Sequence, residues 1–128
     1  RGGRQALGAG GASVDLTDLV VEANRLSGLL DKGIAALRDA SVRHAQADHH
    51  YRKSRAIAYL QASGTVAERD AHADIETAEG RLDRDLAAGE AEAAREAVRA
   101  RRTQLSAVQS LLNAHRAEAE FSRVGPRS

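Results

Sequence analysis

The sequence contains no cysteine, methionine or tryptophan, and only one proline, one phenylalanine and two tyrosines. Without cysteine there is no disulfide framework and no thiolate metal site, which suits a cytoplasmic protein. So few aromatic residues leave little bulky material for a compact core or for a β-sheet. Burial must come mainly from alanine, leucine, valine and isoleucine. An alanine-rich chain with abundant arginine, glutamate and aspartate is typical of long helices.

A strong excess of charge of either sign is also missing. Nineteen basic and eighteen acidic residues in 128 give a formal net charge of +1. This balance argues against a strongly basic nucleic-acid binder, although it permits local stripes of cations. No apolar run approaches the length of a membrane span, so we expect one soluble domain with no membrane partner. Residues 1–13 contain five glycines and are expected to form a flexible leader, and residues 124–128 a tail.

Apolar or small residues recur at steps of three and four from Leu16 to Ser41, with one extra step of four near Leu30. This spacing predicts a helix over residues 15–62, capped by Ser13 or Asp15. The predicted core face continues through His44, Asp48, Tyr51, Arg55, Ala58 and Ala62. The face therefore becomes polar in its second half.

A turn is predicted at residues 63–65. Gly64 can adopt the left-handed conformation that ends a helix, and Thr65 followed by Glu68 forms a capping box. A second helix is predicted over residues 66–122. Its expected core face consists of Ile75, Ala78, Leu82, Leu86, Ala93, Ala97, Leu105, Val108, Leu112, His115 and Ala119. Gly80 and Gly89 leave open whether this helix is continuous.

Two helices joined by so short a turn are expected to form a long antiparallel hairpin, like a coiled coil, in an all-α protein. With the turn centred near Gly64, residue i faces about residue 127 minus i. The end of the second helix after Leu112, which contains Phe121, then has no partner in the chain. Because alanine-rich seams bury little surface, we expect a homo-oligomer.

The segment from His44 to Arg55 concentrates three histidines, an aspartate, a tyrosine and several cations. His44 and Asp48 are four residues apart and share a helix face, so both could reach one metal ion. No metal-binding signature accompanies them, and no metal or other cofactor is expected. A half-buried polar layer or a solvated face is the favoured interpretation.

Two groups of cations are candidate nucleic-acid contacts. Near the turn, Tyr51, Arg52, Lys53, Arg55 and Tyr59 combine positive charge with rings that can stack on bases. Further along the chain lie Arg99, Arg101 and Arg102. The competing interpretation is ordinary surface charge, paired with Asp48, Asp70, Asp74 and Glu96.

Motifs of catalysis are missing. The sequence contains no nucleophile elbow, phosphate loop or dinucleotide fingerprint. Glu118 and Glu120 lie on different sides of a helix and cannot form a pair of catalytic carboxylates. We therefore expect a protein that is not an enzyme.

The stretches YRKSRAIAYLQASGTVAERDAHAD and REAVRARRTQLSAVQSLLNAHRAEAEF resemble small helical proteins from the DNA-metabolism regions of tailed phages of actinobacteria. The order of a tyrosine-rich basic helix, a glycine turn and a late arginine-leucine segment is similar to recombination mediators of the UvsY type. The resemblance spans about Val14 to Arg123. It implies an oligomer that binds single-stranded DNA in the host cytoplasm and works with a recombinase or another phage replication protein.

That resemblance implies backbone contacts by Arg52, Lys53 and Arg55, and an oligomer interface in the late helix. The interface residues are expected to be Leu105, Val108, Leu112 and Phe121. The leading hypothesis is an accessory protein of recombination or replication. The alternative is a structural or adaptor coiled coil that binds only protein, such as a virion component or an inhibitor of a host factor.

Overall fold

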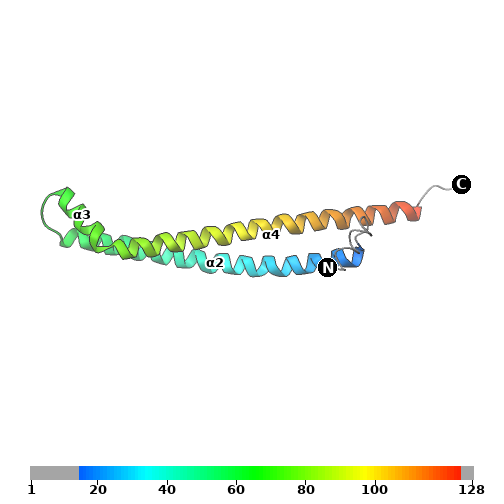
Figure 1. The fold of residues 1–128 in the computed structure, drawn as a ribbon, viewed down its shortest axis with the longest axis horizontal. Coiled ribbons are helices and arrows are strands. Elements are labelled where there is room, and N and C mark those ends of the chain that lie inside the picture. Colours follow the sequence, from blue (N-terminus) through cyan, green and yellow to red (C-terminus); the bar gives the residue numbers. More distant parts are fainter. Residues whose placement is uncertain (1–14, 125–128) are drawn as a thin grey trace, which may run out of the picture. The chain divides into compact units, whose positions relative to one another are not determined.

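The computed structural model describes residues 15–124 and contains only helices in that range (Figure 1). Helix α2 spans Leu16–Gln61, α3 spans Val66–Glu76 and α4 spans Ala78–Val124. The all-α class and the helix before the turn are as predicted. The second predicted helix is two helices, so the two-helix description is corrected to three. The predictions for residues 1–13 and 125–128 lie outside the described residues.

The start of α3 is fixed by the predicted capping box. The Glu68 backbone N–H donates to Thr65 Oγ1 at 3.2 Å, and the Thr65 backbone N–H donates to Glu68 Oε1 at 2.8 Å. The preceding Gly64 has a φ of 109°, a conformation that glycine adopts without steric cost. These reciprocal bonds satisfy two backbone donors that a helix start would otherwise leave free.

Removal of the cap hydroxyl tests this local structure. We expect Thr65→Ala to lower the free energy of unfolding by about 1 kcal/mol, because Glu68 N–H loses its acceptor. Thr65→Ser keeps the hydroxyl and is the matched control. Chemical denaturation followed by circular dichroism measures both variants. Equal stability of Thr65→Ala and wild type would show that the cap contributes nothing.

The division between α3 and α4 is at Thr77 rather than at either glycine. Thr77 is 7% exposed, and its hydroxyl donates to the Ala73 carbonyl at 2.6 Å. A threonine that bonds to the carbonyl four residues earlier bends a helix. Gly80 and Gly89 lie inside α4, which is uninterrupted at both. Helix α4 is therefore continuous through Gly80 and Gly89, and the interruption lies before both glycines, at Thr77.

Helix α2 packs against α4, and the described chain divides into two compact units. The first contains residues 15–31 and 100–124, and the second contains residues 32–99. In the first unit the buried side chains are Leu19, Leu26 and Leu112. In the second they are Ala40, Ala58, Ala73, Ala91 and Val98, together with Thr77. The second unit is thus built on small side chains.

The register of the second unit differs from the prediction. A Cβ placed on Gly33 would lie 3.4 Å from Val98 Cγ2, whereas the expected partner of Gly33 is near residue 94. Arg43 likewise pairs with Glu90 rather than with a residue near position 84. The shift follows from α3, which ends at Glu76 and uses part of the chain before α4 runs back along α2.

The core face of α2 is predicted correctly, and that of α4 only in part. Every predicted core position of α2 after Leu16 is buried or half-buried. On α4, Leu112 is buried and Leu105, Val108 and His115 are half-buried, as expected. The expected core positions Ile75, Ala78, Leu82, Leu86, Ala93, Ala97 and Ala119 are instead exposed. In the second unit the face of α4 that packs on α2 carries Ala91 and Val98.

Candidate functional site

The histidine-rich segment forms a half-buried polar layer on the core face of α2. His44, Asp48, Tyr51 and Arg55 are all half-buried. The guanidinium carbon of Arg84 lies 4.6 Å from the centroid of the Tyr51 ring. A Cβ placed on Gly80 would lie 3.8 Å from Cδ1 of the same ring. Tyr51 therefore packs against α4, and one face of its ring is already occupied by a cation.

The predicted cations near the turn are engaged in ion pairs. Arg52 pairs with Asp48 at 2.9 Å. Arg55 pairs with Asp74 at 3.1 Å and with Asp70 at 3.4 Å. The hydrogen bonds that Arg55 donates, first to Asp74 and then to Asp70, raise the pKa of its guanidinium. These are three of the four carboxylates named in the competing interpretation, which is confirmed for Arg52 and Arg55.

The two remaining candidates near the turn are Tyr59 and Lys53. Arg69 lies 6.0 Å from the centroid of the Tyr59 ring, so this ring also has a cation beside it. Lys53 is exposed and has no ion pair among the described residues. Within residues 15–124, the group therefore offers one ammonium without an ion pair rather than the continuous cationic patch that the sequence suggested.

The second group of candidates lies on α4. Arg99 pairs with Glu96, as the competing interpretation expects. Arg101 is half-buried and donates to Gln104 Oε1 at 3.1 Å. Arg102 is exposed and forms no ion pair with the part of the chain that the structure describes. Of the three predicted residues, Arg102 is thus the one whose guanidinium is available.

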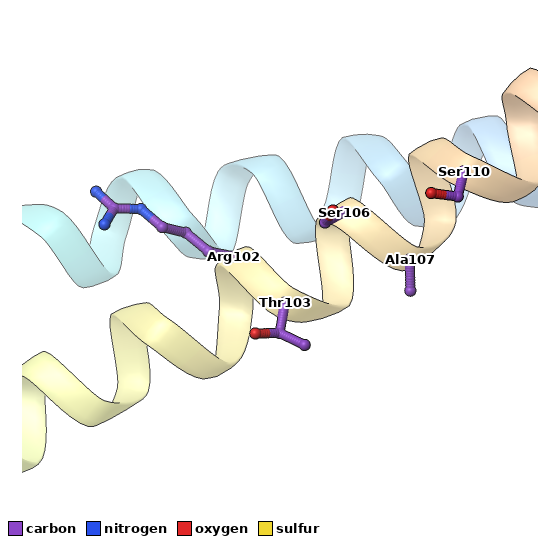
Figure 2. Close-up of a pocket in the computed structure, with 5 residues that line it drawn as sticks. All are labelled: Arg102, Thr103, Ser106, Ala107 and Ser110. Carbon is purple, nitrogen blue, oxygen red and sulfur yellow. The ribbon is translucent and has the colours of Figure 1, made fainter.

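Arg102 borders a shallow hollow in the first unit, with a volume of about 450 Å³. The other lining residues are Thr103, Ser106, Ala107 and Ser110 (Figure 2). In Figure 2, Thr103 and Ala107 point away from the α2 ribbon. A second hollow of about 320 Å³ in the same unit is lined by Ala23, Gln109, Leu112, Asn113 and Arg116.

These hollows lie along one exposed row of α4 that we call the polar stripe. It consists of Arg102, Ser106, Gln109, Asn113 and Arg116, at successive steps of four, three, four and three residues. All five side chains are exposed. Within residues 15–124, Arg116 forms no ion pair. Guanidinium, hydroxyl and amide groups all donate hydrogen bonds, so the stripe presents donors over its whole length.

Ser106, Gln109, Asn113 and Arg116 were missed by the sequence reasoning, which looked for clustered cations. The signal that could have found them is the absence of acid. Residues 97–117 contain four arginines and not one aspartate or glutamate. In a chain with eighteen acidic residues, such a stretch offers its arginines few carboxylate partners on their own helix.

The structure also bears on the predictions about metal binding, membrane segments and the oligomer interface. No group of three or more potential metal ligands occurs within the described residues, and Asp48 is paired with Arg52. None of the helices in this range has the length and apolar character needed to cross a membrane. Of the expected interface residues, Leu112 is buried in the chain itself, Leu105 and Val108 are half-buried, and Phe121 is 75% exposed. Only Phe121 is fully available to another subunit.

The exposed apolar side chains of the second unit are a feature that the predicted interface did not include. Around the turn, Ile57, Leu60, Val66 and Ile75 are exposed, and Leu60 and Ile75 are each about four-fifths exposed.

Comparison with known proteins does not assign the chain to a family, since no family model, curated protein or solved structure matches it.

Proposed function

We propose that this protein is a non-enzymatic accessory that binds the phosphate backbone of single-stranded DNA through the polar stripe of α4. The observation that carries the proposal is the run of donors from Arg102 to Arg116 in a stretch without a carboxylate. Arginine, serine, asparagine and glutamine side chains are the usual contacts to phosphate oxygens. The choice of single-stranded DNA rests on the resemblance of the sequence to recombination mediators.

The dimensions of the stripe suit a strand backbone. Arg102 and Arg116 are fourteen residues apart, or about 21 Å at 1.5 Å per helical residue. Phosphates follow one another every ~3.4 Å along a strand of compact duplex and further apart in an extended strand. Several successive phosphates therefore fit beside the stripe. Contacts of this kind hold the backbone and read no sequence.

Contacts on the polar stripe require fewer existing interactions to break than contacts near the turn. Arg52 and Arg55 would have to leave Asp48, Asp70 and Asp74 to reach a phosphate. Tyr51 and Tyr59 already have Arg84 and Arg69 beside their rings, so base stacking there would displace an existing contact. Arg102 and Arg116 need break no ion pair with the described chain.

Two charge-reversal variants with the same change in net charge separate the two surfaces. Arg102→Glu/Arg116→Glu removes both ends of the stripe, and Arg52→Glu/Lys53→Glu is the matched control near the turn. We expect the stripe variant to lose at least tenfold in affinity for a fluorescent oligo(dT) strand, measured by anisotropy at low salt. Each neutralised phosphate adds about 0.7 to the salt slope on single strands, so the slope should fall by about 1.4.

The outcomes discriminate clearly. A loss confined to the Arg52→Glu/Lys53→Glu variant would overturn the stripe as the contact and restore the original prediction. Tighter binding of duplex than of single strands would contradict the proposed target. A wild-type protein that binds neither oligonucleotide at low salt would overturn the nucleic-acid function.

The second candidate is a structural or adaptor protein that binds only protein partners. It is favoured by the exposed Ile57, Leu60, Val66 and Ile75, which occur close together in the sequence around the turn. Exposed aliphatic side chains of this size are typical of protein-binding surfaces when they gather. Absence of nucleic-acid binding in the experiment above would make this function the leading one.

A further inference from the structure

The second hollow of the first unit, which we call the amide hollow, combines an apolar floor with a polar rim. It has a volume of about 320 Å³ and is lined by residues of both α2 and α4. The lining residues are Ala23, Gln109, Leu112, Asn113 and Arg116. All five belong to the first unit. A volume of this size is at the lower end of those that hold small organic ligands.

The floor of the amide hollow is part of the core of the first unit. Leu112 is 8% exposed, and Ala23 is half-buried. Ala23 is four residues after Leu19 and three before Leu26, so it lies on the same side of α2 as these two buried leucines. An apolar floor of this kind suits the flat face of a ring. It does not suit a phosphate group, which would lose water there without gaining a hydrogen bond.

The rim of the amide hollow carries hydrogen-bonding side chains. Gln109 and Asn113 are four residues apart on one side of α4, and both are exposed. Within residues 15–124, their amides form no hydrogen bond and Arg116 forms no ion pair. An amide has donors and an acceptor, so it can pair with the edge of a nucleobase, which also presents both. The lining contains no carboxylate that would repel a nucleic-acid strand.

We propose that the amide hollow receives one unpaired base of the strand whose phosphates lie along the polar stripe. The inference rests on the proposed function and deepens it by adding a contact to a base. Leu112 and Ala23 contact the face of the ring. The Gln109 and Asn113 amides bond to its edge, and Arg116 holds the adjacent phosphate. Because every base has a flat face and a polar edge, the contact selects an unpaired base rather than a particular sequence.

A hollow that receives a base gives a physical reason for a preference for single strands. In a duplex each base is stacked and paired, and it must leave the double helix before it can enter a protein site. The cost of this step is smallest in a strand that is already single. Contacts to phosphates do not make this distinction, since both forms present phosphates. The preference therefore comes from the amide hollow and not from the arginines of the stripe.

Two fluorescent strands of equal length test the base contact. One is oligo(dT), and the other is an abasic strand with the same phosphates and no bases. We expect the wild-type protein to bind oligo(dT) about tenfold more tightly than the abasic strand in anisotropy at low salt, because only oligo(dT) can fill the amide hollow. Equal affinities would overturn this inference and leave the polar stripe in place. Binding of neither strand would overturn the proposed function, and this inference with it.

Ala23→Leu tests the location of the contact. The larger side chain fills the hollow from α2 and leaves every residue of the polar stripe unchanged. We therefore expect the preference for oligo(dT) to disappear, while the affinity for the abasic strand does not change. Ala114→Leu is the matched control, because Ala114 is exposed and lies two residues from buried Leu112, on the opposite side of α4. It should keep the preference. A preference that survives in Ala23→Leu would overturn the hollow as the site.

Gln109→Ala/Asn113→Ala tests the same contact without adding volume to the packed floor. Removal of both amides should reduce the ratio of the affinities for oligo(dT) and the abasic strand, because the edge of the base loses its partners. Circular dichroism verifies that each variant keeps its helical content. An unchanged ratio in this variant would show that the amides do not contact a base and would overturn the proposal.

Discussion

Leu26→Ala is expected to lower the free energy of unfolding by about 2–5 kcal/mol, the range for truncating a fully buried leucine. Leu26 is 2% exposed and is the largest side chain in the described chain with so little exposure. The other buried side chains of the first unit are Leu19 and Leu112, and surrounding side chains fill the space left by a truncated leucine only in part. Because marginal stability is typical of small proteins, this single change should leave much of the population unfolded.

Val21→Ala is the control for this experiment. Val21 lies on the same helix and in the same unit but is 61% exposed. We expect its effect to stay within about 0.5 kcal/mol. Both variants are measured by denaturant unfolding at one fixed protein concentration, since association would make stability depend on concentration. A cost for Leu26→Ala below 1 kcal/mol would mean that burial of this leucine does not hold the first unit together.

The core face of α2 could be predicted because its apolar residues are large and regularly spaced. Leu19, Leu26 and Ala58 are buried at the positions that the stripe gives. The polar continuation through His44, Asp48, Tyr51 and Arg55 was also identified, and these side chains are half-buried as the favoured interpretation expects. Polar groups remain on this face because they reach partners or the edge of the helix pair, as Tyr51 does against Arg84.

The core face of α4 was predicted wrongly over residues 78–97 for a specific reason. Leu82 and Leu86 were assigned to the core because they follow Ile75 and Ala78 at helical spacing. Alanine occurs on every side of this helix, so the sequence contains more than one apolar row with helical spacing. The structure buries Ala91 and Val98, whose small side chains allow close packing of α2, as the contact between Gly33 and Val98 shows.

The candidate site was predictable only in part, because charge patterns do not say which ions pair. Asp48, Asp70, Asp74 and Glu96 were correctly named as alternative partners of the cations. Which of these pairs form depends on the fold of α3 against α2, since Arg55 reaches residues fifteen and nineteen positions away. The polar stripe was missed because it is defined by which side chains of α4 are exposed. Helical periodicity alone did not predict the exposed face of this helix correctly.

Glycine-to-alanine substitutions are expected to have opposite signs at two positions. At Gly28, inside α2, a Cβ would meet nothing within 4 Å. Gly28→Ala should raise the free energy of unfolding by about 1 kcal/mol, because alanine loses less freedom in a helix. It is therefore the matched control for the same substitution at Gly64, and any general effect of an added methyl group would appear in both.

Gly64→Ala is expected to lower the free energy of unfolding by about 1–3 kcal/mol through its backbone alone, because a φ of 109° is strained for any residue with a Cβ. The new Cβ would also lie 2.6 Å from Glu68 Oε1. This overlap would force the Glu68 carboxylate away from the Thr65 backbone N–H, from which it now accepts a hydrogen bond. Denaturation of Gly64→Ala beside Gly28→Ala measures the effect, and a neutral or stabilising Gly64→Ala would contradict it.

The pH dependence of Gly64→Ala separates backbone strain from loss of the cap. The hydrogen bonds from the backbone and side chain of Thr65 lower the pKa of Glu68 from its usual 4.5. A carboxyl with a lowered pKa stabilises the folded state above pH 4.5, and this stabilisation is lost as the pH falls through the folded-state pKa. Wild type therefore loses this contribution in acid, whereas Gly64→Ala has none to lose. The stability difference should shrink on acidification, and a constant difference would assign the whole effect to the backbone at Gly64.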